Sequence, residues 1–265
     1  MHYGVDVSSH NGKIDWKTLA TEIEFAMLRI GYGKGNIDSK FSYNANECEK
    51  YKIPFGGYWF SYALNKEMAR KEAEACCNII KGFNISLPIA YDWEYDSDKY
   101  AQKQGVKLTK SDILNFADIF CKTIQDKGYA TMIYSNSDYY INKGFSALTS
   151  KYPLWLADWS NHSPKYKCTM WQYTDADTYK GINGKVDADI YYGDIKNENP
   201  TIKSIDTIKA DVFSKIPATW WYSYRDIAVD VIAGKYGNGE ERKTKLKSKG
   251  FDPTIVQLIV NELVV

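Results

Sequence analysis

The sequence predicts an α/β protein: a (β/α) barrel with reduced last helices, followed by a small all-α three-helix C-terminal module. Three observations lead to this fold class. Strand-like and helix-like segments alternate through the first 195 residues or so, the later strands have shorter and less helical connections, and helical patterns follow a polar stretch at 196–206. An open doubly wound sheet is the main structural alternative, although no glycine-rich phosphate loop follows any strand.

Eight segments have the β-branched and aromatic composition that is typical of strands. They are 3–9, 25–33, 53–62, 87–95, 129–136, 152–159, 168–174 and 184–192. Eight strands are the number that a closed barrel of this class needs, and closure makes the first and last strands neighbours.

Helical patterns separate the early strands. They are expected at 15–23, 42–52, 66–83 and 109–128. The third is strongly amphipathic and ends at Gly82, and the fourth has Thr109 or Ser111 as its N-cap and Gly128 after its C-terminal end.

Beyond the polar stretch the apolar spacing is helical. The segments are 205–216, 224–237, 240–250 and 252–265. Pro253 stands at the start of the last one, where a first-turn proline fits. We therefore expect a barrel domain at 1–195, a linker with room for an extra helix at 196–222, and a helical module at 223–265.

The composition argues against several classes of partner. Lys+Arg 34 against Asp+Glu 33 gives a net charge of +1, which provides no field for binding nucleic acid or an acidic membrane. No run of 18 apolar residues exists, so no membrane span is expected. Five cysteines without C-x-x-C spacing indicate buried free thiols made in a reducing compartment. The N-terminal residues lack the pattern of a secretory signal peptide.

Aromatic residues are abundant, with Trp 8 and Tyr 22. Rings that both pack and hydrogen-bond suit a sugar-binding cleft, and they equally suit an aromatic core. Composition alone leaves both interpretations open.

Acidic residues occupy three of the predicted strands. Asp92 and Glu94 follow an apolar lead-in two residues apart, so strand alternation places both on one face, roughly 6.6 Å apart. Asp6 lies in the first strand, and Asp187 and Asp189 lie in the last. In a closed barrel these strands would bring the acids to one mouth, which is where such barrels hold their active sites.

The aromatic neighbours of the central acid pair alternate to the opposite face of the same strand. Tyr91, Trp93 and Tyr95 are therefore expected to pack rather than to contact a substrate.

Such a set of carboxyl groups suits glycoside hydrolysis, which needs one acid to protonate the leaving oxygen and a second group to support the reacting carbon. Like charges held close raise a pKa and keep a proton available near neutral pH. Solvated or capping acids and a site for a hard metal cation are the alternatives. The sequence has no H-E-x-x-H or G-x-S-x-G motif, so a zinc hydrolase or a serine nucleophile is disfavoured.

Seven motifs together resemble glycoside hydrolase family 25, the Chalaropsis-type lysozymes, over roughly residues 1–195. In order they are YGVDVSSHNGKIDW, GGYWFSY, IAYDWE, YSN, LWLADW, MWQYT and GKVDADIY. The resemblance implies a barrel with a shortened last third and N-acetylmuramidase activity on the β-1,4 bond between N-acetylmuramic acid and N-acetylglucosamine. We expect neither a cofactor nor a metal.

The resemblance also implies roles for individual residues. Glu94 matches the general acid/base, and Asp92 matches the acid that acts as nucleophile or orients the 2-acetamido group of the substrate. Asp6 matches the acid of the first strand, and Asp187 matches the acid near the last strand. Substrate contacts are expected at Tyr58, Tyr134, Trp155, Asp158, Trp171, Gln172 and Asp189.

Residues 224–264 resemble the CW-seven cell-wall-binding repeat, a three-helix module that recognises peptidoglycan muropeptide. One copy occurs where several in tandem are common, which limits the affinity that multivalency would give. The residues expected to contact the ligand are Asp226, Gly237, Gly239 and Arg242, with capping and turn roles as the alternative. The preceding 201–221 matches neither module, and its apolar spacing favours an extra helix or a surface for self-association.

Together these features predict a phage-type endolysin that binds and hydrolyses bacterial peptidoglycan for host lysis. It would remain in the host cytoplasm until release and then act on the cell wall. A non-catalytic peptidoglycan-binding protein, a host autolysin of the same activity and a metal-dependent hydrolase are the alternatives.

Overall fold

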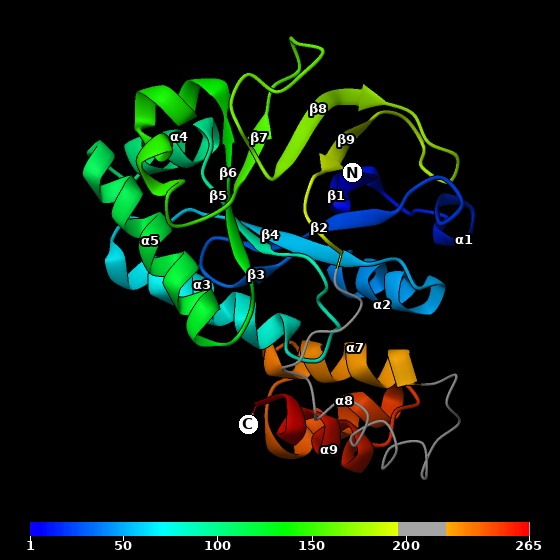
Figure 1. Ribbon diagram of the computed structural model, residues 1–265. Helices are drawn as coiled ribbons and strands as arrows, with labels where there is room; N and C mark the ends of the chain where they lie inside the picture. Colours follow the sequence, from blue (N-terminus) through cyan, green and yellow to red (C-terminus); the bar gives the residue numbers. More distant parts are fainter. Residues whose placement is uncertain (196–220, 265) are drawn as a thin grey trace. The chain divides into compact units, whose positions relative to one another are not determined.

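The computed structural model describes residues 1–195 and 221–264 (Figure 1). The chain divides into two compact units, Met1–Cys77 with Asn84–Asn199, and Asn78–Phe83 with Pro200–Val265. The helix expected at 205–216 and nearly all of the expected linker and self-association surface lie outside the described residues. Within the described ranges, no helix is long and apolar enough to cross a membrane.

Nine strands of the first unit form one sheet in the order β1-β9-β8-β7-β6-β5-β4-β2-β3. Their bounds are β1 (His2–Val7), β2 (Phe25–Tyr32), β3 (Asn36–Ile37), β4 (Phe55–Phe60), β5 (Ile89–Asp92), β6 (Thr131–Asn136), β7 (Leu154–Ala157), β8 (Met170–Asp177) and β9 (Val186–Tyr191). Because β1 also pairs with β2, the sheet closes and leaves the two-residue β3 as a side branch on β2. The predicted barrel is confirmed, and the open sheet is excluded.

The strand that closes the barrel, β9, is antiparallel to both of its neighbours. β9 pairs antiparallel with β1 and with β8, whereas β1, β2 and β4 to β8 are paired in parallel. An antiparallel strand starts at the mouth where the parallel strands end. The start of β9 therefore lies beside the end of β1, with Asp187 in register with Asp6.

Helices connect the early strands and become fewer after β6, as predicted (Figure 1). They are η1 (Ser9–Asn11), α1 (Trp16–Leu19), α2 (Phe41–Tyr51), α3 (Lys66–Ile80), α4 (Tyr95–Lys103), α5 (Lys110–Asp126), η2 (Tyr139–Lys143) and η3 (Phe145–Leu148). α2 packs against β2, and α5 packs against β5 and β6. The links from β7 to β8 and from β8 to β9 contain no helix among the described residues.

One helix boundary and one strand boundary predicted in this unit were wrong. The helix expected at 15–23 ends at Leu19, where the Thr21 hydroxyl donates to the carbonyl oxygen of Thr18, 2.8 Å away. Short hydroxyl side chains compete in this way with the helical hydrogen-bond ladder. In addition, α4 begins at Tyr95, inside the segment expected to be strand.

The predicted ends of α5 are confirmed. The Thr109 hydroxyl accepts a hydrogen bond from the backbone N–H of Asp112, and the Asp112 carboxylate accepts one from the backbone N–H of Thr109. This reciprocal pair satisfies two N–H groups at the N-terminal end that have no partner within the helix. Gly128 follows the helix with φ 86, a conformation that glycine adopts without steric cost.

Buried side chains, most of them large and apolar, fill the interior of the barrel. Its core cluster contains Phe25, Met27, Leu87, Ala90, Met132, Tyr134, Trp155, Ala157, Met170 and Tyr191. This packed layer lies beneath the polar mouth and gives the site a rigid base.

All five cysteines are free thiols. Four are buried, as predicted, and Cys168 is half-buried. Burial raises the pKa of Cys77 and of Cys121 to about 12, so these thiols are protonated and unreactive at neutral pH.

The second unit contains the predicted helical module. Its helices are α7 (Trp221–Ile232), α8 (Gly239–Ser248) and α9 (Pro253–Val264). Pro253 is the first residue of α9, as expected. The Tyr224 and Phe251 rings meet edge to face, and the Tyr224 hydroxyl accepts a hydrogen bond from the backbone N–H of Asp252, which ties α7 to the start of α9.

Candidate active site

A cavity of about 310 Å³ occupies the polar mouth of the barrel. It brings together the four acids Asp6, Asp92, Glu94 and Asp187, which are far apart in the sequence. Asp6 is near the end of β1, Asp92 is the last residue of β5, and Asp187 is the second residue of the antiparallel β9. The convergence expected from a closed barrel is therefore present.

The route by which Glu94 reaches the cavity differs from the prediction. β5 ends at Asp92, and Glu94 is the N-cap of α4, with its backbone N–H donating to the Ser97 hydroxyl oxygen, 3.2 Å away. Strand alternation therefore does not place Glu94. Tyr91 and Trp93 are buried, as expected, whereas Tyr95 is 49% exposed because it opens the helix instead of continuing the strand.

A hydrogen-bonded chain holds Asp6 in position. The Tyr134 hydroxyl and the Trp159 indole N–H both donate to Gln172 Oε1, each over 3.1 Å. An indole N–H can only donate, so the amide oxygen of Gln172 faces it and the amide nitrogen is left to donate elsewhere. That nitrogen donates to Asp6 Oδ2 over 2.7 Å.

Burial and repulsion by neighbouring carboxylates raise the pKa of every acid in the cavity. Burial is the largest cause for each of them. With repulsion from Asp187 and Asp96, it raises the pKa of Glu94 to about 7. Burial and Asp175 raise the pKa of Asp187 to about 6. A carboxyl group with a pKa near 7 holds a transferable proton at neutral pH.

Asp6 and Asp92 are more deeply buried than Glu94 and Asp187, and their pKa values are raised well above the usual value. Burial followed by the charges of Glu94 and Asp6 raises the pKa of Asp92 well above its usual value, while Arg29 opposes this rise. The buried Oδ1 of Asp92 accepts no hydrogen bond from the described residues. An acceptor without a partner beside an open cavity is available to a ligand N–H.

The predicted aromatic contacts divide into two groups. Tyr58, Tyr134 and Trp155 line the cavity, where both tyrosine rings meet the Trp155 ring nearly edge on, at 5.9 and 4.9 Å between centroids. Gln172 lines it too. Trp171 is not among the described residues that line the cavity, since it is buried and its indole N–H donates to the carbonyl oxygen of Asp158.

Asp158 and Asp189, two polar residues predicted to contact the substrate, are also not among the described residues that line the cavity. The Asp158 carboxylate accepts from Ser160, Asn161 and the backbone N–H of Lys165, which orders the loop after β7. Asp189 is fully buried and accepts from the Trp155 indole N–H over 2.7 Å. Both residues support the site from outside the cavity, so direct substrate contact by them is not what the geometry favours.

Part of the cavity lining was not predicted from the sequence. Its remaining members are Ser8, His10, Asn11, Phe60, Lys185, Val186 and Arg29. Arg29 carried a readable signal, because it is the one charged residue in the otherwise apolar strand FAMLRIGY. Across the described ranges, no three His, Cys, Asp or Glu residues form a group that could hold a metal ion.

The helical module has a cavity of its own, of about 1020 Å³. Gly239 and Arg242 line it, whereas Gly237 and Asp226 do not. Arg242 also fixes the preceding loop, because its Nε donates to the carbonyl oxygen of Gly237 and its Nη2 to Asn238 Oδ1. Ligand contact by these four residues remains a prediction.

Known proteins resemble the chain in both parts. The lysozyme of Streptococcus phage Cp-7 is 26% identical, over 98% of this chain and 69% of that protein. The autolytic lysozyme of Clostridium acetobutylicum is 23% identical, over 70% of this chain and 54% of that protein. The modular autolysin LytC from Streptococcus pneumoniae, solved in complex with a synthetic peptidoglycan ligand, has a TM-score of 0.64 and 28% identity over 72% of this chain. This chain spans 46% of LytC, so it corresponds to about half of each of the latter two proteins.

Family models match both units of the sequence. The model for glycosyl hydrolases family 25 matches residues 5–182, and the model for the CW_7 repeat matches residues 225–264. Both resemblances predicted from motifs are confirmed. The chain therefore belongs to glycosyl hydrolases family 25, whose model covers well over half of its length, and it is a glycoside hydrolase that carries a CW_7 repeat behind the family domain.

Proposed function

We propose that this protein is a muramidase that hydrolyses the β-1,4 bond between N-acetylmuramic acid and N-acetylglucosamine in bacterial peptidoglycan. The observation that carries the proposal is a half-buried carboxyl group with a pKa of about 7, that of Glu94, in one cavity with the unpaired carboxyl oxygen of Asp92. Glycoside hydrolysis needs such a proton donor and a second carboxyl group close to it.

In this mechanism Glu94 donates its proton to the glycosidic oxygen as the bond from that oxygen to the anomeric carbon breaks. The Asp92 Oδ1 accepts the N–H of the 2-acetamido group, and the acetamido oxygen attacks the anomeric carbon. Glu94 then removes a proton from water, which opens the cyclic intermediate. An orienting role suits Asp92, because its buried Oδ1 accepts no hydrogen bond from the described residues and is available to the acetamido N–H.

The other two acids of the cavity, Asp6 and Asp187, raise the pKa values of Asp92 and Glu94. Asp6 is held by Gln172 and repels Asp92, while Asp187 repels Glu94 and keeps its proton in place. The metal-dependent alternative predicts that EDTA abolishes activity, and the proposed mechanism predicts full activity in EDTA.

We further propose that the protein is a phage endolysin that acts on the host wall after release from the cytoplasm. The phage Cp-7 lysozyme aligns with 98% of this chain, which includes the CW_7 repeat. A host autolysin is the second candidate, because the autolytic lysozyme of Clostridium acetobutylicum aligns with 70% of this chain. A non-catalytic wall-binding protein is disfavoured, since all four acids are present and converge on one cavity.

The test is the Glu94→Gln variant in a turbidity assay on purified walls. Removal of the proton donor is expected to lower lysis at least a thousandfold and to leave sedimentation with walls unchanged. Glu67→Gln is the matched control, because Glu67 lies on the surface of α3 in an exposed ion pair with Lys71. Near-normal lysis by Glu94→Gln would contradict the mechanism. Mass analysis of the released reducing ends would separate a muramidase, which leaves reducing muramic acid, from a glucosaminidase.

A further inference from the structure

The acidic cavity also contains cationic groups that the proposed hydrolysis does not use. Arg29 and Lys185 line it together with the imidazole of His10. Arg29 lies in the parallel strand β2, and its side chain is 14% exposed. A cation held inside a cavity is costly unless it has partners, so its surroundings indicate what it does.

One edge of the Arg29 guanidinium is fixed by two partners. Its Nε donates to Asp38 Oδ2 over 2.7 Å, and its Nη2 donates to the Ser9 hydroxyl oxygen over 3.0 Å. The Asp38 side chain is fully buried, and its oxygens also accept from the backbone N–H groups of Ser9 and Lys40. The guanidinium is thus held in one orientation before any ligand arrives.

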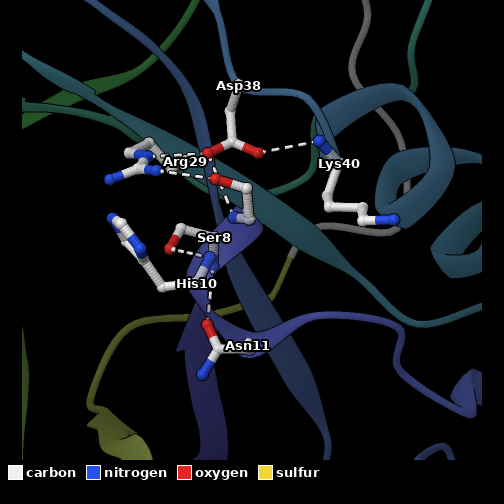
Figure 2. Close-up of polar contacts among 7 residues, drawn as sticks. Ser8, His10, Asn11, Arg29, Asp38 and Lys40 are labelled. Carbon is white, nitrogen blue, oxygen red and sulfur yellow. Dashed lines mark hydrogen bonds and ion pairs between the residues drawn. The ribbon is translucent and has the colours of Figure 1, made fainter.

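The loop that carries His10 is fixed by the same network. The Ser8 hydroxyl oxygen accepts from the backbone N–H of His10, and Asn11 Oδ1 accepts from the backbone N–H of Ser8. These bonds order the turn directly after β1, the strand that bears Asp6. Figure 2 shows the His10 ring beside the guanidinium edge of Arg29 that has no bond to Asp38 or to the loop.

That remaining edge has the chemistry of a carboxylate receptor. No described residue accepts a hydrogen bond from Arg29 Nη1, and this nitrogen and the His10 ring lie on one side of the network (Figure 2). A guanidinium binds carboxylates through directed, charge-assisted hydrogen bonds, and fixing it in advance lowers the entropy lost on binding.

We propose that Arg29 and His10 form a subsite for a carboxylate group on the lactyl side of N-acetylmuramic acid. The inference rests on the proposed muramidase function, and it adds the feature of the substrate that this end of the cavity reads. The carboxylate has two sources, the lactyl carboxyl itself in peptide-free glycan and a carboxyl of the stem peptide in intact glycan. Lys185, which lines the same cavity, adds positive charge for either source.

Binding is measured with the full chain carrying Glu94→Gln, so that no ligand is cleaved. Three soluble glycans are compared by calorimetry: one with free lactyl carboxylates, one with lactyl carboxamides, and one whose lactyl groups carry a dipeptide with a free carboxylate. We expect at least tenfold tighter binding of one carboxylate form than of the carboxamide. The form that binds more tightly identifies the source.

Arg29→Gln is then introduced, and the preference is expected to fall to about twofold or less. Because this change leaves Asp38 buried without its cation, Arg29→Gln with Asp38→Asn serves as a second variant that keeps a neutral hydrogen-bonding pair. His10→Gln should lower the preference by a smaller factor. Arg70→Gln, which removes a positive charge from the exposed surface of α3, is expected to keep the full preference.

The outcomes are distinct. Equal binding of all three glycans by the parent protein, or a preference that survives in a folded Arg29 variant, would overturn the subsite. Wild-type protein that cleaves none of the glycans would instead refute the muramidase function, and the binding comparison would still report on the subsite. Cleavage by the wild type together with loss of preference in both Arg29 variants supports both proposals.

Discussion

Proton placement at the mouth of the barrel depends on four carboxyl groups whose ionisation is opposed by burial and by neighbouring carboxylates. Burial is the largest cause of each raised pKa, and neighbouring carboxylates add to it. The protons are therefore shared by the group as a whole, and a pH profile reports on the cluster rather than on one residue. Glu94, whose pKa rises to about 7, exchanges its proton within the pH range of ordinary assays.

This placement predicts a definite pH dependence. Glu94 must be protonated to act, so kcat/KM on soluble muropeptide should fall tenfold per pH unit above about pH 7. Asp187→Asn removes a repulsion that raises the pKa of Glu94, so the alkaline limb should move to lower pH. Asp126→Asn, which removes an exposed acid at the end of α5, is the control and should leave the limb in place. An unchanged limb in Asp187→Asn, or a move to higher pH, would contradict this electrostatic assignment.

The acids of the site could be found from the sequence, and the groups that position them could not. Asp6 and Asp92 lie near the ends of parallel strands, so closure predicts that they meet, whereas Asp187 joins them because β9 is antiparallel. The bonds from Gln172 to Asp6 and from Trp155 to Asp189 depend on side-chain directions across the barrel, which sequence spacing does not contain. Arg29 was missed because its partner Asp38 lies in another segment.

The junction between β5 and α4 is the element on which the acid pair depends. Trp93 lies between Asp92 and Glu94, and its indole N–H donates to Asp98 Oδ1 over 3.1 Å. The other oxygen of Asp98 accepts from the Tyr139 hydroxyl and pairs with Lys143. Although burial acts in the opposite direction, these donors hold the pKa of Asp98 below its usual value. The helix start that carries Glu94 is thus anchored to η2.

Lys143→Met tests this anchor. Loss of the ion pair should loosen Asp98 and Trp93 and misplace Glu94, so kcat on soluble muropeptide should fall roughly tenfold with little change in KM. Lys99→Met is the matched control, because Lys99 forms an exposed ion pair with Asp96 on α4. This variant should change kcat less than twofold. Equal effects of the two variants, or a change confined to KM, would show that the anchor does not position the acid.

The same junction shows the limit of periodicity as a guide to elements. Alternation from Ile89 to Tyr95 predicted a strand throughout, yet the chain turns into α4 after Trp93. Glutamate is not a favoured N-cap residue, so the start of this helix gave no local signal. The strong signals, such as Thr109 with Asp112 before α5 and Pro253 at the start of α9, were read correctly.

At the scale of the whole molecule, the closed barrel was predictable because eight alternating segments leave few topologies that satisfy every strand edge. The direction of β9 was not predictable in the same way. A strand joined to its predecessor by a short link can run either way until its neighbours are known. Its antiparallel course places Asp187 at the start of β9, beside the ends of the other strands.

The division of the chain into a barrel and a CW_7 module predicts that attachment and cleavage separate. Deletion of residues 201–265 should lower the fraction of protein that sediments with purified walls at least tenfold, because the second site no longer raises the effective concentration of the first. The kcat/KM on a small soluble muropeptide should stay within about twofold, since the cavity is built from residues 6–187. Arg242→Ala keeps the full length and removes a side chain that lines the module cavity, so it should weaken sedimentation in the same direction by a smaller factor. A deletion that loses soluble activity while it still sediments with walls would show that the module supports the barrel rather than targeting it.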